Sequence, residues 1–401
     1  MRIVFLVRQF PSLSDTRVLD QALSLIERGH EVDVVSFRPG LWKTTHADVR
    51  KSGLHHRVSS FNVPRNWLIR ALKSLWLLYL NLDEIHRFFK ALNVFRYGKD
   101  ALAGNLFYAA IGFPRKNIDV LYCHTAQMGR IGAFVQDCFF VQKIVTLIYE
   151  DEITRRLVSP GQARALAQRQ DLLLTDTERA LWTLLRWEAD PQKIKPLPCG
   201  VKLPLFMKDR RPKVVTGRTT LNIVMISRLA KEVDFGPVLR ALAQLRRQHQ
   251  RVEFHCEIIG DGELREDWEI LTKALGLAAA VHFAGEKSRE DVVEYLAAAD
   301  LFIAPAKPVT SGITILEAQA AGIPALVPDS PGGRLLIRDR ENGLLYSPKD
   351  VKTLVGQIYF LIMNPQDAAR IAAEGRRSVE RNHVFGQLNK KLEEALQGLF
   401  R

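Results

Sequence analysis

Short runs of apolar and β-branched residues alternate along this chain with stretches of helical periodicity. In the first half, the apolar run 2–7 is followed by a helical pattern over 16–28, which Gly29 closes, and then by a second apolar run over 31–37. Alternation of strands with helices is typical of parallel sheets covered by helices on both faces. We therefore predict an α/β fold with a doubly wound sheet in this half.

The same alternation begins again at Leu221. The predicted helices are 237–247, 263–275 and 289–299, and the predicted strands are 221–227, 252–260, 281–285 and 300–306. Two such series predict two Rossmann-like domains, and the stretch 201–220, rich in Pro, Lys, Arg and Thr and without periodicity, predicts their connection. Open α/β sheets bind ligands beyond the C-terminal ends of their strands, so two facing sheets would form an interdomain cleft.

Length and charge narrow the class of protein. At 401 residues, the chain exceeds what one hydrophobic core usually organises, which again favours two domains. The net charge of +13 indicates contact with something anionic, either nucleic acid, a membrane surface or phosphorylated small molecules. The sequence carries no signal of a recognition helix or an aromatic RNA-binding platform, so we predict no nucleic-acid partner.

The cysteines and the N-terminus favour a cytoplasmic protein. The four cysteines stand far apart, without a Cys-x-x-Cys pair or a histidine at zinc-ligand spacing, and so predict neither a disulfide framework nor a metal site. The first residues lack the apolar core and cleavage site of a signal peptide, because Arg8 interrupts the apolar run. We interpret them as the first strand.

Residues 64–99 depart from the general pattern. They contain seven Arg and Lys residues against two acidic ones, together with seven aromatics, and the apolar run 75–80 is far too short to span a bilayer. Two interpretations stay open. The segment forms two ordinary helices on the first sheet with their basic residues in solvent, or it forms an amphipathic helix on an anionic membrane surface, with Trp67, Trp76 and Tyr79 at headgroup depth.

The stretch 309–328, VTSGITILEAQAAGIPALVP, predicts a loop, a short helix over 314–321 and a strand. Backbone N–H groups at Gly312, Ile313 and Thr314 would open this helix and suit a diphosphate. Glu317, in the first turn, has two interpretations. Its carboxylate accepts both vicinal hydroxyls of a ribose, or it forms a capping box with Thr314. The local sequence does not decide between them.

With these motifs in place, the chain resembles the retaining glycosyltransferases of family 4, which have the GT-B fold of two facing Rossmann-like domains. The resemblance covers nearly the whole chain and rests on segments in the family's order, among them FPSLSDTRVLDQALSLIERGHEVDVVSF, IDVLYCHT, PLPCGVKLPLF, ISRLAKEVDFGPVLRAL, IIGDGELRE, LEAQAAGIPALVPDSPGG and RDRENGLLYSPKD. It implies an N-terminal acceptor-side domain over 1–203, a C-terminal nucleotide-sugar domain over 204–381, and a final segment, 382–401, that packs back on the N-terminal domain.

The resemblance also implies roles for single residues. It puts Arg228 on the donor diphosphate, where a planar guanidinium matches phosphate oxygens in pairs, and Glu317 on the ribose. Lys231 or Lys213 would replace a lysine that the family usually has near Arg228. The full implied set is, for the donor, Arg228, Lys231, Gly312, Ile313, Thr314 and Glu317; for the loop after the first strand, Pro11, Ser12 and Ser14; and for catalysis, His124 and Asp151.

Apolar residues stand at four positions where the family usually has polar active-site residues. These are Ile148 in place of a histidine, Val233 in place of the lysine, and Val309 and Leu335 each in place of a glutamate.

The resemblance implies an enzyme that moves a hexosyl group from a nucleotide sugar to a lipid-linked or polysaccharide acceptor, with retention of configuration and without a metal or other cofactor. Together with residues 64–99, it implies a cytoplasmic protein bound peripherally to the inner face of the cell membrane. The alternative, which the four apolar replacements keep open, is a degenerate, non-catalytic GT-B protein that serves as the partner subunit of an active glycosyltransferase.

Overall fold

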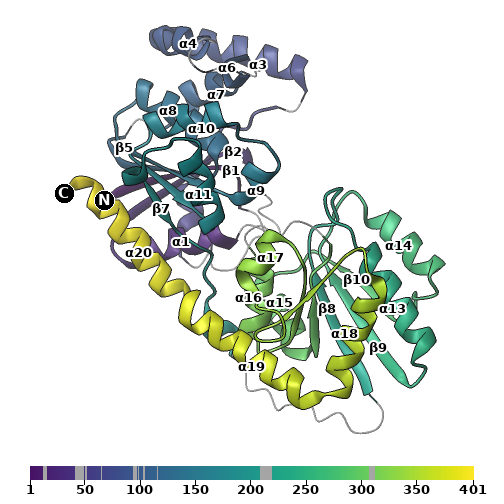
Figure 1. The fold of residues 1–401 in the computed structure, drawn as a ribbon. Coiled ribbons are helices and arrows are strands. Elements are labelled where there is room, and N and C mark those ends of the chain that lie inside the picture. The colour runs from purple at the N-terminus through teal and green to yellow at the C-terminus, as the bar shows by residue number, and fades with distance from the viewer. Residues whose placement is uncertain are drawn as a thin grey trace. The chain divides into compact units, whose positions relative to one another are not determined.

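The computed structural model describes residues 1–11, 16–40, 49, 52–64, 66–93, 97, 99–102, 104–114, 116–207, 219–306 and 312–401. The chain divides into two compact units, which we describe separately. The N-terminal unit comprises Met1–Pro198 together with Asn389–Arg401, and the C-terminal unit comprises Cys199–Leu388 (Figure 1).

The N-terminal unit is built on a seven-stranded sheet in the order β3-β2-β1-β4-β5-β6-β7. All its neighbouring strands pair in parallel. The strands are β1 (Arg2–Phe10), β2 (Glu31–Pro39), β3 (Val58–Ser60), β4 (Ile118–Cys123), β5 (Val141–Ile148), β6 (Leu172–Thr175) and β7 (Ile194–Pro196). The central strands are buried on both faces, as in β1, where Ile3 to Val7 are all buried, which explains why they read as continuous apolar runs.

Helices connect these strands and cover the sheet. They are α1 (Thr16–Glu27), α3 (Trp67–Leu80), α4 (Ile85–Ala91), α6 (Lys99–Leu102), α7 (Asn105–Gly112), α8 (Ala126–Cys138), α9 (Glu150–Thr154), α10 (Pro160–Arg169) and α11 (Glu178–Arg186), with the 3₁₀ turns η2 (Leu54–Arg57), η3 (Leu82–Glu84) and η4 (Pro191–Lys193). Figure 1 shows α3 and α4 as an outer layer of this unit, where both contact α7, which in turn contacts α8.

The C-terminal unit has a six-stranded parallel sheet in the order β10-β9-β8-β11-β12-β13. The strands are β8 (Thr219–Ile226), β9 (Val252–Ile259), β10 (Val281–Gly285), β11 (Leu301–Ile303), β12 (Ala325–Pro328) and β13 (Leu344–Tyr346). The helices are α12 (Leu203–Phe206), α13 (Gly236–Gln248), α14 (Arg265–Ala274), α15 (Arg289–Ala298), α16 (Ile313–Ala320), α17 (Pro331–Leu336), α18 (Val351–Met363) and α19 (Pro365–Asn382).

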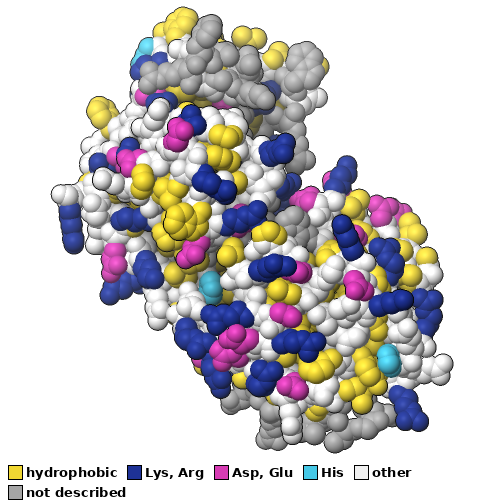
Figure 2. Space-filling view, viewed as in Figure 1, with side chains coloured by type: hydrophobic (Ala, Val, Ile, Leu, Met, Phe, Trp, Pro, Cys, Tyr) yellow, Lys and Arg dark blue, Asp and Glu magenta, His cyan; other side chains and the backbone are white. Residues whose placement is uncertain are grey.

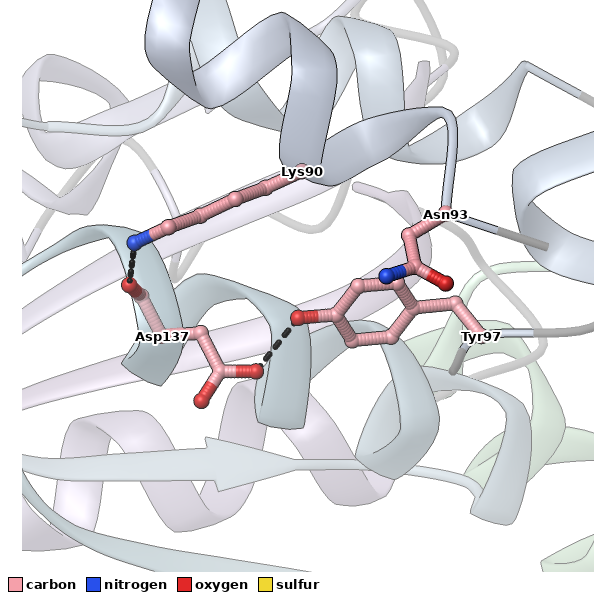
Figure 3. A pocket seen from close by; sticks show the side chains of 4 residues that line it. All are labelled: Lys90, Asn93, Tyr97 and Asp137. Atoms are coloured by element: carbon pink, nitrogen blue, oxygen red, sulfur yellow. Dashed lines mark hydrogen bonds between the residues drawn. The ribbon is translucent and has the colours of Figure 1, made fainter. Parts of the chain in front are cut away.

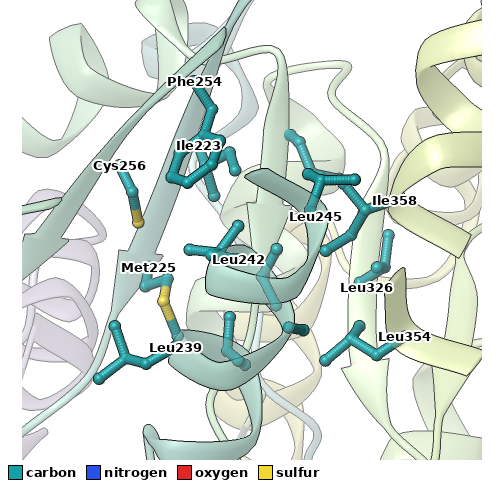
Figure 4. Packing of buried hydrophobic residues seen from close by; sticks show 14 of the residues in the cluster. Ile223, Met225, Leu239, Leu242, Leu245, Phe254, Cys256, Leu326, Leu354 and Ile358 are labelled. Atoms are coloured by element: carbon teal, nitrogen blue, oxygen red, sulfur yellow. The ribbon is translucent and has the colours of Figure 1, made fainter. Parts of the chain in front are cut away.

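The core of this unit forms where α13 and α18 pack on one face of the sheet. Side chains from β8 and β9 meet the apolar stripe of α13, which repeats at helical spacing. Figure 4 shows this packing, with Ile223 and Met225 of β8, Phe254 and Cys256 of β9, Leu239, Leu242 and Leu245 of α13, Leu326 of β12, and Leu354 and Ile358 of α18.

Helix α20 (Phe385–Gln397), followed by η5 (Gly398–Phe400), ends the chain in the N-terminal unit. Leu392 and Leu396 are buried in the same core as Phe5 and Leu25. Glu393 accepts hydrogen bonds from Arg28 at 2.9 Å and from the ring of His30 at 3.0 Å. Apolar packing and two polar contacts therefore hold the end of the chain to the first helix and the turn after it.

These observations confirm the predicted fold class of two Rossmann-like parallel sheets. Within the residues that the structure describes, no helix combines the length and the apolar character needed to cross a membrane.

Candidate functional site

In the C-terminal unit, the order of the strands reverses between β8 and β11, which pair directly through Leu301 and Ile223. Such a switch point is where open α/β sheets bind ligands, beyond the C-terminal ends of the strands. Arg228 lies in the loop that follows β8, and α16 is the helix that follows β11. The topology therefore places Arg228 and the N-terminus of α16 on either side of this switch point.

The side chains of Arg228 and Lys231 are exposed. Neither makes a hydrogen bond or an ion pair with any residue of the described ranges, whereas Arg265, further along the chain, is held by Asp261 and Glu269. Two cations without protein partners at a switch point suit a ligand that carries negative charge.

The loop that carries Arg228 is held by main-chain contacts. Its amides donate to the turn after β9, from Ser227 N to Ile259 O and from Leu229 N to Asp261 O, both at 3.0 Å. This close approach requires glycine: a Cβ on Gly260 would lie 2.0 Å from Ser227 O, and one on Gly262 would lie 2.4 Å from Leu229 O. Gly260 also has a φ of 137°, which other residues rarely adopt.

A second contact ties the same loop to the exit of β11. Asp234 and Ala306 exchange backbone hydrogen bonds of 2.8 and 2.9 Å. The buried hydroxyl of Tyr346 donates to Ala304 O at 2.7 Å, just before that bridge. The segment leading toward α16 and the loop bearing Arg228 are therefore fixed to one another.

Helix α16 begins at Ile313 with Gly312 as its N-cap, at a φ of 63° and without a side-chain capping bond. The capping-box interpretation of Thr314 and Glu317 is wrong, because this left-handed glycine starts the helix two residues earlier and leaves Thr314 inside the first turn. Gly312, Ile313 and Thr314 are half-buried, and Glu317 is only 9% exposed. Backbone N–H groups at the start of a helix favour an anion, which matches the neighbouring cations.

The apolar replacements that the structure describes have different environments. Ile148 is fully buried and packs with Ala126 and Val158. Val233 is 2% exposed in the main core of the C-terminal unit. Leu335 is 47% exposed on α17, beside Arg334, which pairs with Asp329. Val309 lies outside the described residues. Two of the replacements thus contribute to the cores of their units.

In the N-terminal unit, the strand order reverses between β1 and β4, and His124 directly follows β4. Its ring packs against Phe5 and Tyr122, with ring centroids 4.8 and 4.3 Å apart. It is 4% exposed, and neither ring nitrogen has a partner among the described residues. Burial, with a smaller contribution from the charge of Arg17, lowers the pKa of His124 to about 3. The imidazole is therefore neutral at physiological pH.

Buried carboxylates follow the next two strands, and the sequence analysis missed them. Both oxygens of Glu152 accept from Ala126 N at 3.0 Å, and one accepts from Tyr149 N at 3.3 Å. Asp176 accepts from Glu150 N at 2.8 Å. Burial raises the pKa of Glu152 to about 7 and that of Asp176 to about 6. Their signal in the sequence was an acidic residue close after an apolar strand.

The remaining predicted residues are described only in part. Pro11 is buried, and its backbone approaches Gly40 so closely that a Cβ there would lie 2.1 Å from Pro11 O. Ser12 and Ser14 lie outside the described residues, and so does the side chain of Asp151, whose backbone belongs to α9.

A small pocket of about 140 Å³ lies elsewhere in the N-terminal unit, lined by Lys90, Asn93, Tyr97 and Asp137 (Figure 3). Lys90 Nζ donates to the backbone oxygen of Asp137 at 2.8 Å, and the carboxylate of Asp137 accepts from Tyr97 and from Arg169. Asp137 lies in the last turn of α8, before β5, and therefore at the N-terminal ends of the strands. These groups fasten the segment after α4 to α8, and the pocket is separate from the candidate site.

The described residues include no group of three or more His, Cys, Asp and Glu side chains arranged to hold a metal ion.

Comparison with known proteins supplies a family match. Residues 207–378 match the family described as Glycosyl transferases group 1. The chain is 27% identical over 418 residues to the putative colanic acid biosynthesis glycosyltransferase WcaL of Escherichia coli strain K12, and the alignment covers 100% of both chains. It is 24% identical over 415 residues to the amylovoran biosynthesis glycosyltransferase AmsK of Erwinia amylovora, again with 100% of both covered.

Solved structures of low sequence identity share the fold. HepE of Anabaena, in complex with UDP-glucose, superposes with a TM-score of 0.70 at 18% identity, covering 99% of this chain and 100% of that one. Sucrose-phosphate synthase of Thermosynechococcus elongatus has a TM-score of 0.72 at 15% identity, covering 100% and 99%. The fold is that of the GT-B glycosyltransferases.

Proposed function

We propose that this chain, whose residues 207–378 match the group 1 glycosyl transferases, is a glycosyltransferase of polysaccharide biosynthesis with a nucleotide-sugar donor. One observation carries the proposal: exposed Arg228 and Lys231, without partners in the described ranges, lie at the β8/β11 switch point together with the N-terminus of α16. The names of WcaL and AmsK support the process, and the UDP-glucose complex of HepE supports the class of donor.

In this proposal, Arg228 pairs with the donor diphosphate and Lys231 takes the place of the lysine that Val233 replaces. The amides of Gly312, Ile313 and Thr314 contribute the positive end of a helix. Groups held ready for charge that develops on a leaving diphosphate lower the barrier to transfer, and each contributes a factor of about 10²–10³ in rate. Glu317, which is not part of a capping box, is the proposed ligand of the ribose.

The finer features follow from the resemblance and are proposals of the same kind. The sugar is transferred with retention of configuration, no metal is required, and the acceptor is a lipid-linked or polysaccharide hydroxyl presented at the cytoplasmic face of the membrane. His124 and Asp151 are the proposed catalytic-site residues of the N-terminal unit. Since His124 is neutral, its contribution is a hydrogen bond and not a charge.

Thermal stability in the presence of nucleotide sugars tests the donor. A ligand at about 100 times its Kd stabilises the folded state by about 2.7 kcal/mol, which raises Tm by about 5–10 °C in a unit of the size of Cys199–Leu388. We expect one or two members of a panel of UDP-, GDP- and dTDP-hexoses to produce this shift. If none does, the proposed donor site is wrong.

Transfer is measured next, as incorporation of labelled sugar from the stabilising donor into a bacterial lipid extract. Product formation supports the enzyme. Stabilisation without any transfer or donor hydrolysis favours the non-catalytic alternative. The buried apolar residues Ile148 and Val233 would then explain the loss of activity.

A further inference from the structure

Helix α3 has its polarity reversed with respect to an ordinary surface helix. Its apolar stripe is exposed: Leu68, Leu72, Leu75, Trp76 and Tyr79, which we call the outer face of α3, are 53–74% exposed. These positions recur at helical spacing along one side of the helix. Figure 2 shows hydrophobic side chains at the top of the view, where Figure 1 places α3 and α4.

The polar side chains of α3 point toward the protein instead. Arg70 donates to the side-chain oxygen of Asn105 at 2.7 Å, and Lys73 donates to Asn62 O at 2.9 Å. Ser74 bonds to the hydroxyl of Tyr108 at 3.3 Å. These are the Arg, Lys and Ser residues of α3. The interpretation of residues 64–99 as helices with a basic solvated face is therefore wrong for α3.

The next helix continues the same arrangement. Phe89 and Leu92, on and just after α4, are 68% and 64% exposed, while Arg87 lies over the ring of Phe139 at 4.4 Å and Lys90 donates to Asp137 O. In α4, Arg87 and Lys90 thus contact the protein, although Lys90 itself is exposed, while Phe89 and Leu92 lie in solvent. Exposed apolar side chains gathered on neighbouring helices in this way mark a binding site.

We propose that the outer face of α3 lies in the interface of a lipid bilayer. A protein partner would find too few hydrogen-bonding groups on this face, because protein interfaces carry about one hydrogen bond per 100–200 Å². This face offers only the polar edges of Trp76 and Tyr79, and those two residue types are the ones that concentrate at the level of lipid headgroups. The net charge of +13 favours approach to an anionic surface.

The geometry restricts how α3 meets the bilayer. Its 14 residues span about 21 Å, less than the roughly 30 Å hydrocarbon core, so the helix lies along the interface. Arg70, Lys73 and Lys90 already hydrogen-bond to the protein. Membrane binding therefore depends mainly on burial of the apolar side chains, and less on contact of these cations with lipid phosphates. The use of this face to reach a lipid-linked acceptor rests on the proposed function; the binding itself does not.

Vesicle flotation of the full chain tests the inference. The wild type is expected to float with neutral phosphatidylcholine vesicles even in 1 M NaCl, and more strongly with added phosphatidylglycerol at low salt. The combined variant Leu72→Ser, Trp76→Ser, Tyr79→Ser is expected to partition at least 10-fold less. The matched control, Phe140→Ser with Trp182→Ser, removes aromatics that are 82% and 61% exposed outside α3 and α4 and should float like the wild type.

Several outcomes would overturn the proposal. They are a wild type that does not float, a triple variant that floats as well as the control, and binding that disappears with neutral vesicles. Analytical ultracentrifugation without lipid tests whether a second copy of the chain occupies this face instead. If the wild type is a dimer, the triple variant is a monomer and the wild type does not float, the face is a dimer interface. Stabilisation by nucleotide sugars, measured on both proteins, separates failure of this inference from failure of the proposed donor site.

Discussion

The loops at the C-terminal ends of the strands are held by different interactions in the two sheets. At the edge of the C-terminal unit, main-chain hydrogen bonds and the close approach of Gly260 and Gly262 fix the loops, so the cations Arg228 and Lys231 stay exposed. At the edge of the N-terminal unit, the buried side chains of Glu152 and Asp176 hold the loops. Polar groups are thus available to a ligand at the first edge, whereas these carboxylates at the second already serve the fold.

The largest expected effect comes from adding a side chain to Gly260, which packs directly against the backbone of Ser227. Gly260→Ala places a Cβ 2.0 Å from Ser227 O at a φ of 137°, and the strain of such a backbone alone costs about 1–3 kcal/mol. We expect the unfolding free energy of this unit to fall by about 3 kcal/mol or more, measured by urea denaturation.

The matched control for that variant is Gly356→Ala. Gly356 is exposed in α18, and a Cβ there meets nothing within 4 Å, so alanine should stabilise the helix by about 0.5–1 kcal/mol. Equal effects of the two substitutions would mean that main-chain packing does not hold the Arg228 loop.

Arg228→Ala tests whether the exposed edge binds the donor. Removing the guanidinium leaves diphosphate charge without its partner, which costs about 1.5–3 kcal/mol. Calorimetry with the stabilising nucleotide sugar should show affinity about 10- to 100-fold lower, at unchanged Tm without ligand. Arg370→Ala, an exposed arginine of α19 paired with Asp367, should bind normally; a similar loss in both would point to a general effect of charge.

Glu152→Gln tests the buried edge through pH. The folded-state pKa of about 7 lies above the ordinary value of 4.5, so the folded state keeps a proton that the unfolded state releases between those values. The unfolding free energy of the N-terminal unit therefore falls as pH rises from about 4.5 to 7. The variant should remove about 1–3 kcal/mol of this fall, measured by denaturation at pH 5 and pH 8.

Glu178→Gln, at an exposed site on α11, is the control for that measurement. It should leave the pH dependence of the wild type intact. If Glu152→Gln leaves it intact as well, burial of this carboxylate does not govern the stability of the N-terminal edge.

The smallest expected effect is that of Thr314→Ala. Since Gly312 and not Thr314 is the N-cap of α16, stability should change by less than about 0.5 kcal/mol. Ser288→Ala removes a real capping box, in which Ser288 accepts from Asp291 N, and should cost about 1 kcal/mol. A larger loss at position 314 than at 288 would restore the capping interpretation of Glu317.

Part of the site was accessible from local patterns. The alternation of apolar runs and helical stretches predicted two parallel sheets, and the ends of those runs predicted that the start of α16 lies at the C-terminal end of a strand, whereas Arg228 was singled out only by the family resemblance. Both inferences hold because periodicity and turn residues act over a few neighbouring positions, which the sequence displays directly. The carboxylates Glu152 and Asp176 were missed, because their importance comes from burial and not from spacing.

By itself, the sequence determined the class of fold, the order of its elements and the positions that follow each strand. Only the tertiary structure decided which side chains face inward. The cations of α3 were the strongest composition signal for a membrane surface, yet Arg70 and Lys73 bond to Asn105 and Asn62 and leave the apolar side outward. A helical pattern separates polar from apolar faces, but the face that meets the protein depends on residues distant along the chain, whose contacts no local pattern contains.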